Sequence, residues 1–298
     1  MTTAAGVGFI GLGQIGQPMA LRLIDWSGGL WVCDVDPKAT IALQELGANV
    51  VATPRELAEH VSFVSVMVRD DDQVREVLCG PDGILAGAPA SHHGGDGDGG
   101  LVVAIHSTIH PDTARELAEL ASRQGVSVLD APVSGGAMGA RNGRLAIMVG
   151  GDIEAYASSR DALARMGELV LHLGPVGAGT QAKLARNLLH FVAFTAATEA
   201  QRLAEAAGID LLALGRIVRH TDAITGGPGA IMLRESTAPV PEDDNWRPIL
   251  EHVWALGEKD LALAIELGDQ LGVDTPLAHL AYERLGPGLG LTPMGRTE

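Results

Sequence analysis

Apolar residues in the first half of the chain occur in short runs, and these runs alternate with longer helical patterns. The runs cover residues 7–10, 30–35, 62–68, 101–105, 126–129, 145–149 and 169–173. Short strands that alternate with helices are typical of a mostly parallel sheet with helices on both faces. The pattern therefore predicts an α/β fold, with a doubly wound sheet domain over residues 1–175.

After residue 173 the strand pattern stops, and residues 180–207 follow a single helical pattern that ends at Gly208. At 1.5 Å per residue, such a helix is about 40 Å long. A helix of this length extends beyond one small domain, so it predicts an interdomain helix that leads into an all-α domain over residues 176–298. Further helices are predicted at residues 209–220, 248–271 and 276–285.

Two stretches lack regular periodicity. Residues 85–100 are polar and rich in glycine, which predicts a mobile surface insertion, and the composition of residues 286–298 predicts a frayed end. Four side chains in the first stretch could bind a metal, namely His92, His93, Asp96 and Asp98. A flexible segment cannot supply the outer contacts that hold metal ligands in place, so no metal site is expected.

Composition limits the partners. The 298-residue chain carries 21 basic and 37 acidic residues, which give a formal net charge of −16. Nucleic acids and anionic membrane surfaces are therefore poor partners. If the substrate is itself an acid, a few local cations and backbone N–H groups must receive it.

The sequence also bears on location and on thiol chemistry. It has no run of 18 apolar residues and no leader-like start, so a cytoplasmic location is expected. The two cysteines, Cys33 and Cys79, suggest neither a disulfide framework nor a metal motif. Both are expected to be inert thiols that are buried or half-buried.

The first apolar run continues directly into Gly11-x-Gly13-x-x-Gly16 and then into a helical pattern. The first glycine permits a tight turn, the second lets the backbone approach a pyrophosphate, and the third lets helix and strand pack closely. A lone motif of this kind is weak in a chain with 39 glycines, but here a strand precedes it and a helix follows. It therefore predicts a Rossmann-type dinucleotide site, in which Gln14 and Ile15 also contact the cofactor.

An acidic residue follows the glycines at the expected distance. Asp34 lies near the end of the second apolar run, about 20 residues beyond the motif, where a carboxylate accepts hydrogen bonds from the adenosine ribose. A 2′-phosphate would meet this negative charge, and Val35 follows in place of an arginine. Asp34 thus favours NAD over NADP, although Lys38 lies close enough in sequence to weaken that preference. Val68, at the end of the third run, is a further candidate cofactor contact.

A second group of candidates lies where the helical half begins. The segment GPVGAGTQAKLARN places Lys183 and Asn187 four residues apart, on one face of the helix. A lysine on a helix is usually solvated, but this one lies in a stretch rich in alanine and leucine at the predicted domain junction. The segment DAPVSGG predicts a turn in which the Ser134 hydroxyl and the N–H groups of Gly135 and Gly136 hold a carboxylate; an ordinary turn is the alternative.

Two further positions have weaker support. The run at 101–105 delivers Ser107 and Thr108 to the carboxyl edge of the sheet, where open α/β sheets bind ligands, although both residue types are also common helix caps. Lys259 and Asp260 lead another helical pattern. Adjacent helix residues point apart, so at most one of the two faces a cleft, and a solvated pair is the alternative.

The segments GFIGLGQIGQPMA, DAPVSGG, GPVGAGTQAKLARN and KDLALA occur in the order and spacing seen in the β-hydroxyacid dehydrogenase family, which the chain resembles over about residues 7–271. That family includes 3-hydroxyisobutyrate dehydrogenases and tartronate semialdehyde reductases. The lysine segment is the most specific part of the resemblance, because a generic Rossmann protein has no reason to contain it.

The resemblance implies a role for each matching residue. It implies that Lys183 is the catalytic acid/base and that Thr108 and Lys259 lie near the nicotinamide. The implied substrate-binding residues are Ser134, Gly135, Gly136 and Asn187. It also implies an all-helical second domain and a homodimer or homotetramer.

Two departures from the family pattern stand out. Ile15 replaces the methionine usual in the first motif, a change of similar volume that leaves the loop intact. Residues 220–246 do not follow the expected pattern in the substrate-lining part of the helical domain. The identity of the hydroxy acid therefore stays open.

The expected activity is the reversible, NAD-dependent oxidation of a small 3-hydroxy acid to its semialdehyde or 3-oxo acid, with Lys183 as general acid/base. An imine reductase-like, NADPH-dependent reductase is one alternative, but such enzymes usually carry a different residue at the position of Lys183. A non-catalytic dinucleotide-binding scaffold is another, but it has no need of both Lys183 and Asn187. A 6-phosphogluconate dehydrogenase shares the nucleotide-binding half, but its helical part is usually much longer.

Overall fold

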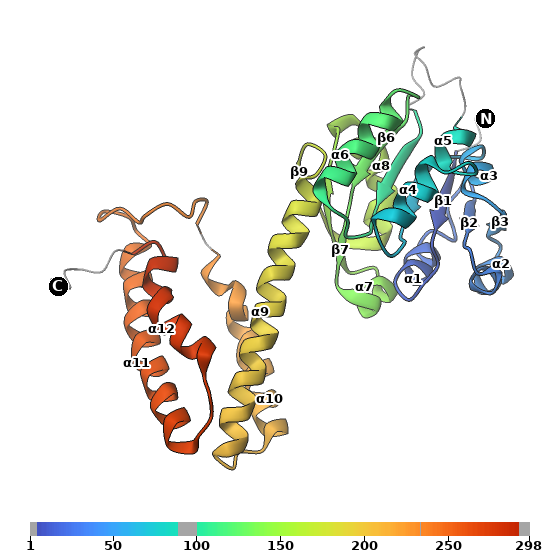
Figure 1. The fold of residues 1–298 in the computed structure, drawn as a ribbon. Coiled ribbons are helices and arrows are strands. Elements are labelled where there is room, and N and C mark those ends of the chain that lie inside the picture. Colours follow the sequence, from blue (N-terminus) through green and yellow to red (C-terminus); the bar gives the residue numbers. More distant parts are fainter. Residues whose placement is uncertain (1–4, 89–99, 233, 292–298) are drawn as a thin grey trace. The chain divides into compact units, whose positions relative to one another are not determined.

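The computed structural model describes residues 5–88, 100–232 and 234–291 (Figure 1). The contact pattern divides the chain into two units, Met1–Arg186 and Asn187–Glu298. This division falls inside the long helix α9 (Ala178–Ala206). The boundary predicted from the sequence, between residues 175 and 176, precedes the same helix.

A sheet of nine strands forms the centre of the described part of the first unit. Its strands are β1 (Gly6–Ile10), β2 (Leu30–Cys33), β3 (Asn49–Val50), β4 (Val61–Val66), β5 (Val102–Ile105), β6 (Ser127–Asp130), β7 (Val133–Ser134), β8 (Leu145–Gly150) and β9 (Gly167–Gly174). The order is β3-β2-β1-β4-β5-β6-β8-β7, and β9 pairs with β8. The first six strands in this order are parallel, β8 is antiparallel to β6 and β7, and β9 is parallel to β8.

This topology confirms the predicted α/β fold with a mostly parallel sheet. The apolar pattern located seven of the nine strands. It missed β3 and β7, because strands of two residues are too short to show a periodic pattern.

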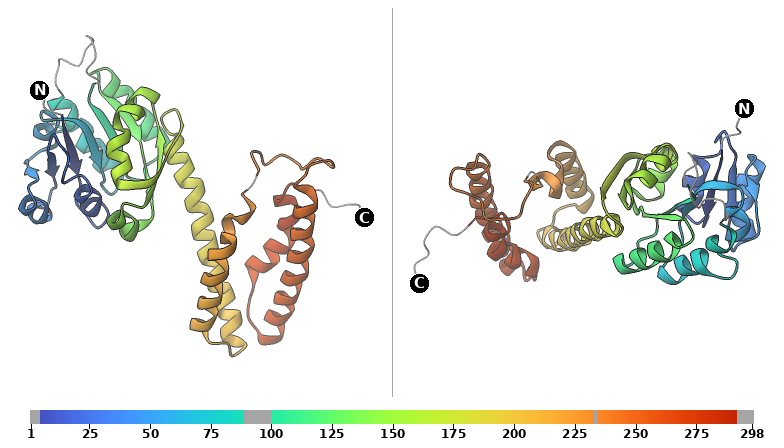
Figure 2. Two further views of the ribbon diagram at one scale, coloured as in Figure 1. Left: turned by 180° about the vertical axis from the view of Figure 1, so that it is seen from behind. Right: turned by 90° about the horizontal axis from the view of Figure 1, so that it is seen from above.

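Helices cover both faces of the sheet (Figure 2). They are α1 (Gly16–Leu21), α2 (Ile41–Glu45), α3 (Pro54–Ala58), α4 (Asp71–Cys79), α5 (Ile84–Gly87), α6 (Pro111–Ser122), α7 (Gly136–Asn142) and α8 (Ile153–Met166). Alternate strand residues point to opposite faces. Val7 and Phe9 pack in one buried cluster with residues of α1, α7 and α8, whereas Ile10, Val64 and Val66 pack in another with residues of α3, α4 and α6.

Two sequence-based expectations for this unit are wrong. Residues 85–88 do not begin a mobile insertion, because Ile84 and Leu85 of α5 are only 0% and 8% exposed and pack in the second cluster. The remainder of that stretch, with His92, His93, Asp96 and Asp98, falls in residues 89–99, outside the described residues. Cys33 is buried as expected, but Cys79 is exposed.

The second unit is helical, as predicted. After α9 come α10 (Leu211–Thr225), α11 (Arg247–Leu271) and α12 (Pro276–Gly288), with a short 3-10 turn at Gly227–Ile231. The single long helix is confirmed: α9 has 29 residues, and Gly208 follows it with a φ of +74°. Over the described ranges, no helix is both long and apolar enough to cross a membrane.

The small core of this unit corrects another expectation. Val240, Leu250, Leu289 and Leu291 form a buried cluster, so residues 286–291 are not frayed. Val240 N–H donates to the Gly290 carbonyl at 2.8 Å, and the Arg234 guanidinium donates to the Leu289 carbonyl at 3.2 Å. Part of the unusual 220–246 segment is therefore built into the core. Residues 292–298 lie outside the described ranges.

Candidate active site

Three glycines shape the loop that follows β1, and each has a different reason to be glycine. Gly11 has a φ of +89°, and a Cβ there would lie 2.3 Å from the Met67 carbonyl oxygen. A Cβ on Gly16 would lie 1.9 Å from the Gly11 carbonyl oxygen. A Cβ on Gly13 would meet nothing within 4 Å. The fold itself thus requires the first and third glycines, and the second leaves space beside the backbone.

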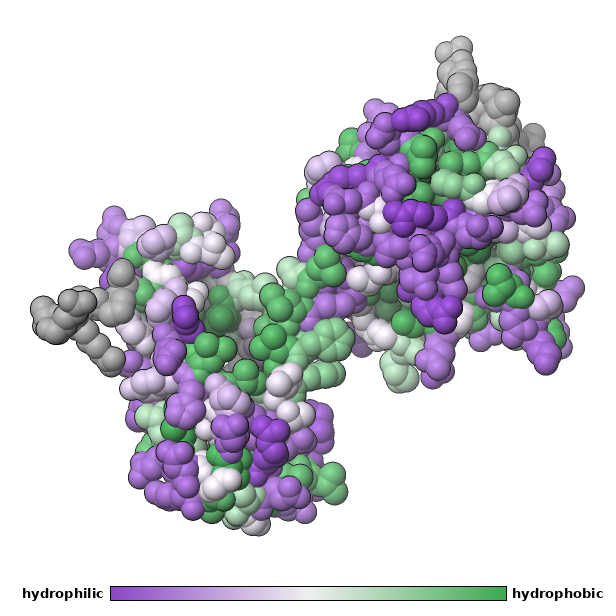
Figure 3. Space-filling model, in the orientation of Figure 1, coloured by the Kyte–Doolittle hydropathy of each residue, from purple (hydrophilic) through white to green (hydrophobic). Residues whose placement is uncertain are grey.

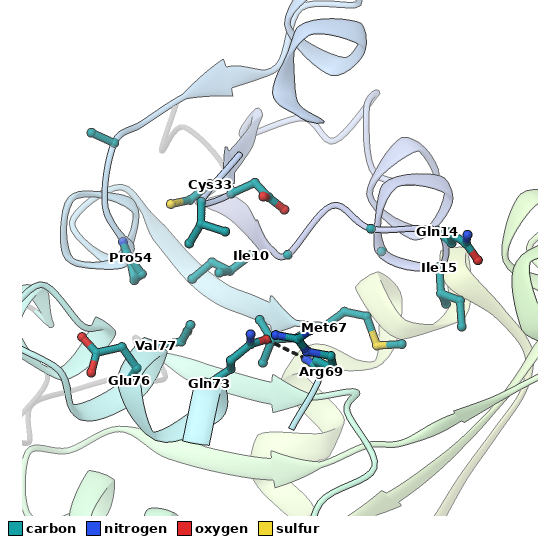
Figure 4. Close-up of a pocket in the computed structure, with 17 residues that line it drawn as sticks. Ile10, Gln14, Ile15, Cys33, Pro54, Met67, Arg69, Gln73, Glu76 and Val77 are labelled. Carbon is teal, nitrogen blue, oxygen red and sulfur yellow. Dashed lines mark hydrogen bonds between the residues drawn. The ribbon is translucent and has the colours of Figure 1, made fainter. Parts of the chain in front are cut away.

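A cavity of about 510 Å³ opens beside this loop, at the carboxyl ends of β1, β2 and β4 (Figure 4). The strand order reverses at β1, because the chain continues to β2 and β3 on one side of β1 and returns to β4 on its other side. Open α/β sheets bind ligands at such a point. The predicted cofactor residues that line it are Gly11, Gly13, Gln14, Ile15, Gly16, Asp34 and Val68.

Different residues line the two ends of the cavity. Ile10, Cys33, Pro54, Glu76 and Val77 lie around one end, and Gln14 and Ile15 lie at the other (Figure 4). Several lining residues that no motif had indicated come from the strand ends and from α4. They are Ala52, Met67, Arg69, Gln73 and Glu76.

Asp34 holds the backbone around the cavity with both of its carboxylate oxygens. Leu12 N–H donates to Oδ2 at 2.6 Å, and Asp36 N–H donates to Oδ1 at 2.8 Å. β2 ends at Cys33, so Asp34 follows the strand directly. Each carboxylate oxygen has more than one acceptor site, so Asp34 can also accept from a ligand hydroxyl.

Ser107 fixes the position of Val68 at the same edge of the sheet. Its hydroxyl donates to the Val68 carbonyl at 2.7 Å and accepts from Val68 N–H at 3.0 Å. These bonds tie the loop after β4 to the loop after β5. The neighbouring Thr108 is exposed, and the following helix α6 is capped by His110.

Lys183 lies near the start of α9, within the first unit, and its side chain is buried. The residue is 9% exposed, and Nζ donates to the Val133 carbonyl at 2.7 Å and to Ser134 Oγ at 3.1 Å. The solvated-lysine alternative is therefore wrong. The sequence elements GPVGAGTQAKLARN and DAPVSGG meet at this amine.

The surroundings of Lys183 make its charged form less favourable than in a solvated lysine. Burial lowers the pKa of the amine below its ordinary value of 10.5, and the nearby Arg186 guanidinium lowers it further. A larger fraction of the side chain is therefore neutral near physiological pH than in a solvated lysine. Such an amine can accept a proton as well as donate one.

Ser134 lies in a short strand and not in a turn. β7 pairs antiparallel with β8, Val133 opposite Ile147 and Ser134 opposite Ala146. Beyond the strand, Gly135 and Gly136 have φ of +129° and +60° and lead into α7. The strand pairing orients the Ser134 hydroxyl, and a Cβ on Gly136 would meet nothing within 4 Å, so this backbone is open to a ligand.

His106 is a buried residue that the sequence pattern did not single out. Nδ1 lies 2.8 Å from the Ala131 carbonyl oxygen, and Nε2 lies 3.0 Å from Ser65 Oγ. Because a carbonyl only accepts, Nδ1 carries the hydrogen and Nε2 accepts from the serine. Desolvation lowers the pKa of His106 to about 4, so the ring is neutral. It joins β4 and β5 to the segment that leads to Ser134.

Three predicted site residues are not among these contacts. Thr108 is exposed at the sheet edge, and Asn187 and Lys259 belong to the second unit. Lys259 lies in the middle of α11 and not at a helix start, and its Nζ is 3.1 Å from Asp260 Oδ1, with both side chains well exposed. The roles of all three stay predictions.

The described ranges contain no group of three or more His, Cys, Asp or Glu side chains placed to hold a metal ion. Cys33 lines the cavity, but burial and the nearby Asp34 carboxylate raise the pKa of its thiol to about 11, so the thiol is protonated near neutral pH.

Two family models match the chain. Residues 6–174 match the NAD binding domain of 6-phosphogluconate dehydrogenase. Residues 177–286 match a domain described as the NAD-binding domain of NADP-dependent 3-hydroxyisobutyrate dehydrogenase. Together the two matches cover both units.

Whole-length relatives agree with these matches. An uncharacterized oxidoreductase of Mycobacterium tuberculosis is 50% identical over 285 residues, 96% of this chain and 93% of the relative. The 3-hydroxyisobutyrate dehydrogenase of Pseudomonas aeruginosa is 33% identical over 279 residues, 92% of this chain and 89% of the relative.

Solved structures show the same fold. The 3-hydroxyisobutyrate dehydrogenase of M. tuberculosis, solved with L-serine, has a TM-score of 0.64 at 30% identity and covers 95% of this chain and 93% of its own. An imine reductase from Myxococcus stipitatus has a TM-score of 0.72 at 18% identity, over 95% of this chain and 92% of its own. At that identity the likeness concerns the fold alone.

Proposed function

Because the chain belongs to the β-hydroxyacid dehydrogenase family of NAD(P)-dependent oxidoreductases, we propose that it oxidises a small 3-hydroxy acid reversibly to the semialdehyde or 3-oxo acid. One observation carries the proposal. The buried Lys183 amine lies between the Val133 carbonyl and the Ser134 hydroxyl, with its pKa lowered. This environment suits a proton-transfer group and not a surface charge.

The cavity beside the glycine loop fits a dinucleotide. The open space at Gly13 is where a pyrophosphate can approach the backbone, and the side chains of Ile10, Pro54 and Val77 offer apolar surface to an adenine ring. When bound, the nicotinamide supplies the hydride chemistry. The protein's own residues must bind and orient the substrate and manage one proton.

Lys183 is the residue that manages this proton. In the oxidative direction its neutral amine takes the hydroxyl proton while hydride leaves the carbinol carbon, and the resulting ammonium then releases the proton to solvent. In the reductive direction the ammonium returns a proton to the developing alkoxide. Positioned proton transfer is worth about 10²- to 10⁴-fold in rate. Val133 and Ser134 hold the amine in place during both directions.

The substrate carboxylate is received by backbone and hydroxyl groups next to Lys183. Ser134 is in contact with the amine, and the N–H groups of Gly135 and Gly136 follow it in the chain with a left-handed backbone that suits an anion. Asn187 lies one turn beyond Lys183 on the same helix, which supports a role in holding the substrate.

We infer that NAD is the preferred cofactor. The Asp34 carboxylate lines the cavity and is fixed by two backbone N–H groups. A 2′-phosphate brought to this carboxylate would be repelled, whereas ribose hydroxyls would donate to it. The neighbouring Val35 side chain carries no charge that could offset the repulsion.

We infer that the chain self-associates through its helical unit, as a homodimer or homotetramer. Large apolar side chains stay exposed along α9, such as Leu188 at 69%, Phe191 at 60% and Val192 at 51%. Figure 3 shows hydrophobic surface over this helix. The unit buries few apolar residues of its own, so a second copy of the chain is the partner that best covers this face.

Steady-state kinetics test the proposed reaction. Rates are measured with NAD and NADP over a panel of 3-hydroxy acids that includes 3-hydroxyisobutyrate, L-serine and glycerate. The panel is repeated with Lys183→Ala, and with Arg123→Ala, an exposed residue paired with Glu119, as a control. We expect Lys183→Ala to keep NADH binding and to lose about 10²- to 10⁴-fold in kcat, and the control to keep its rate.

Two outcomes would contradict the proposal. Full activity of Lys183→Ala would remove the amine from the mechanism. Reduction of cyclic imines with NADPH, without turnover of any 3-hydroxy acid, would favour an imine reductase-like activity.

A further inference from the structure

Asp130 is a fully buried carboxylate at the end of β6, and its two oxygens are bound by the start of α9. Gly177 N–H donates to Oδ1 at 2.7 Å, and Thr180 N–H donates to Oδ2 at 2.7 Å. Both donors belong to backbone groups that have no partner within the helix. The negative charge is thus held by oriented N–H groups at the positive end of a 29-residue helix.

Two glycines make this close approach possible. A Cβ on Gly150 would lie 2.4 Å from Asp130 Oδ1, and a Cβ on Gly179 would lie 2.4 Å from the Asp130 carbonyl oxygen. The Gly179 Cβ would also lie 2.3 Å from the Met148 carbonyl oxygen. No larger residue fits at either position without movement of backbone or of the Asp130 side chain, so the start of α9 lies directly against the ends of β6 and β8.

Asp130 differs from the ordinary helix caps of this chain. Asp152 and Asp210 each directly precede the helix whose N–H groups they bind, α8 and α10. Asp130 lies 47 and 50 residues before its two donors. It therefore fixes the position of the start of α9 relative to the sheet, which a local cap cannot do.

The contacts of Asp130 and Lys183 join the same two short segments, residues 130–134 and residues 177–183. Asp130 binds Thr180, and three residues further along α9 Lys183 binds Val133 and Ser134, which lie three and four residues after Asp130. The two segments are thus tied together at both ends. Movement of α9 at Asp130 would move the amine away from the Ser134 hydroxyl.

We propose that Asp130 is a positioning residue for the reaction, because it seats the start of α9 so that the Lys183 amine meets the substrate-holding strand β7. This inference rests on the proposed function, in which that amine transfers the proton. Asp130 does not line the cavity beside the glycine loop, so its effect should fall on turnover and not on cofactor binding.

Asp130→Asn is the first test. The amide keeps the shape but presents an NH₂ group to one of the two N–H donors, which loosens the seat of α9. We expect kcat to fall by about 10- to 100-fold, as for a reacting group displaced by about 1 Å, with the Kd for NADH and the KM for the cofactor unchanged. Rates are normalised by the stoichiometry of NADH binding, so that unfolded protein does not contribute.

Asp152→Asn is the matched control. It alters the carboxylate that accepts from Glu154 N–H and Ala155 N–H at the start of α8, and it should leave the normalised kcat unchanged. If Asp130 acts only as a stabilising cap, Asp130→Asn will melt earlier but will keep the normalised kcat of the wild type. That result would overturn the inference.

Thr180→Pro removes one of the two donors and keeps Asp130, so it decides the matter if Asp130→Asn does not fold. At this position no bond within the helix is lost, and the proline ring, which takes the place of the N–H, pushes the Asp130 carboxylate away from the start of α9. The buried Thr180 hydroxyl has no hydrogen-bond partner to lose. We expect the same loss of normalised kcat, and a wild-type value would overturn the inference. Full activity of Lys183→Ala would instead refute the proposed function, which separates the two failures.

Discussion

The side-chain nitrogen of Lys183 lies 2.7 Å from the carbonyl oxygen of Val133, although 50 residues separate the two in the sequence. A carbonyl oxygen accepts from the amine in either protonation state, so this contact can persist while the proton moves. Burial at the same place lowers the pKa of the amine. The same surroundings thus fix the position of the Lys183 amine and lower its pKa.

We expect the Lys183 amine to titrate below 10.5, because burial disfavours its charged form. The rate of hydroxy-acid oxidation should rise with pH through this pKa, since the neutral amine is the base. The chain has three lysines, Lys38, Lys183 and Lys259, so ¹⁵N-lysine labelling gives a simple NMR spectrum. Lys183→Arg assigns the signal, and a titration at or above 10.5 would contradict the assignment of the base.

Substitution of Gly13 should separate folding from cofactor binding. A valine side chain there meets open space within the fold, but it projects into the region that the pyrophosphate needs. We expect Gly13→Val to keep the melting temperature of the wild type and to weaken NADH binding at least about tenfold, measured by fluorescence titration. Gly229→Val, also at an open position but in the second unit, is the control and should bind NADH normally.

Asp34→Asn should shift the cofactor preference toward NADP. The amide removes the charge that repels a 2′-phosphate and keeps an oxygen that can accept from Leu12 N–H. The Asp36 N–H loses its acceptor, but that contact is exposed, so water can replace it. We expect the ratio of kcat/KM for NADP to that for NAD to rise by roughly 10- to 100-fold. Asp36→Asn alters an exposed carboxylate two residues away and should leave this ratio unchanged. A wild type that prefers NADP would contradict the role given to Asp34.

His106 should make the protein less stable in acid. Its pKa is about 4 in the folded protein against 6.5 for an ordinary histidine, so the unfolded chain binds the extra proton first. The free energy of unfolding therefore has its full value above pH 6.5 and falls by about 3 kcal/mol as the pH drops toward 4. Urea unfolding across this range should show a steeper pH dependence for the wild type than for His106→Asn.

The control for that measurement is His220→Asn, which alters an exposed histidine. It should retain the wild-type slope even if its overall stability changes slightly. Equal slopes for the wild type and His106→Asn would show that the buried ring does not titrate in this range.

Charge placed on the exposed face of α9 should prevent self-association. Leu188 and Val192 are four residues apart on this helix, 69% and 51% exposed, so Leu188→Glu with Val192→Glu puts two charges on the proposed contact. We expect a lower molar mass by sedimentation and an unchanged mass for Leu46→Glu, which alters a leucine 60% exposed in the first unit. A wild type that is monomeric at micromolar concentration would contradict the proposal.

Most of the correct predictions depend on residues that are close together in the sequence. The glycine loop, the acidic residue after β2 and the 29-residue helix each depend on neighbouring residues, and each appears in the structure. Lys183 was identified because the segment around it, GPVGAGTQAKLARN, resembles a segment of the family. Its burial, which excludes a solvated side chain, depends on Val133 and Ser134 from far earlier in the chain.

What the sequence missed depends on contacts between distant segments. Asp130 is the first residue of the DAPVSGG motif, but the sequence analysis gave it no role. Its two hydrogen-bond donors follow 47 and 50 residues later, so no local pattern reveals them. No sequence motif includes His106, whose partners Ser65 and Ala131 are far from it in the sequence. Composition was misleading for residues 85–88 and 286–291, where glycines and prolines surround a few leucines that pack into the cores.

The cluster of Val240, Leu250, Leu289 and Leu291 sets a limit on how far the chain can be shortened. A truncation that ends at Gly288 would remove two of the four buried side chains and uncover the other two. It would also deprive Arg234 of the Leu289 carbonyl and Val240 of the Gly290 carbonyl. Removal of the residues after α12 would therefore destabilise the loop that precedes α11, even though every helix stays in the chain.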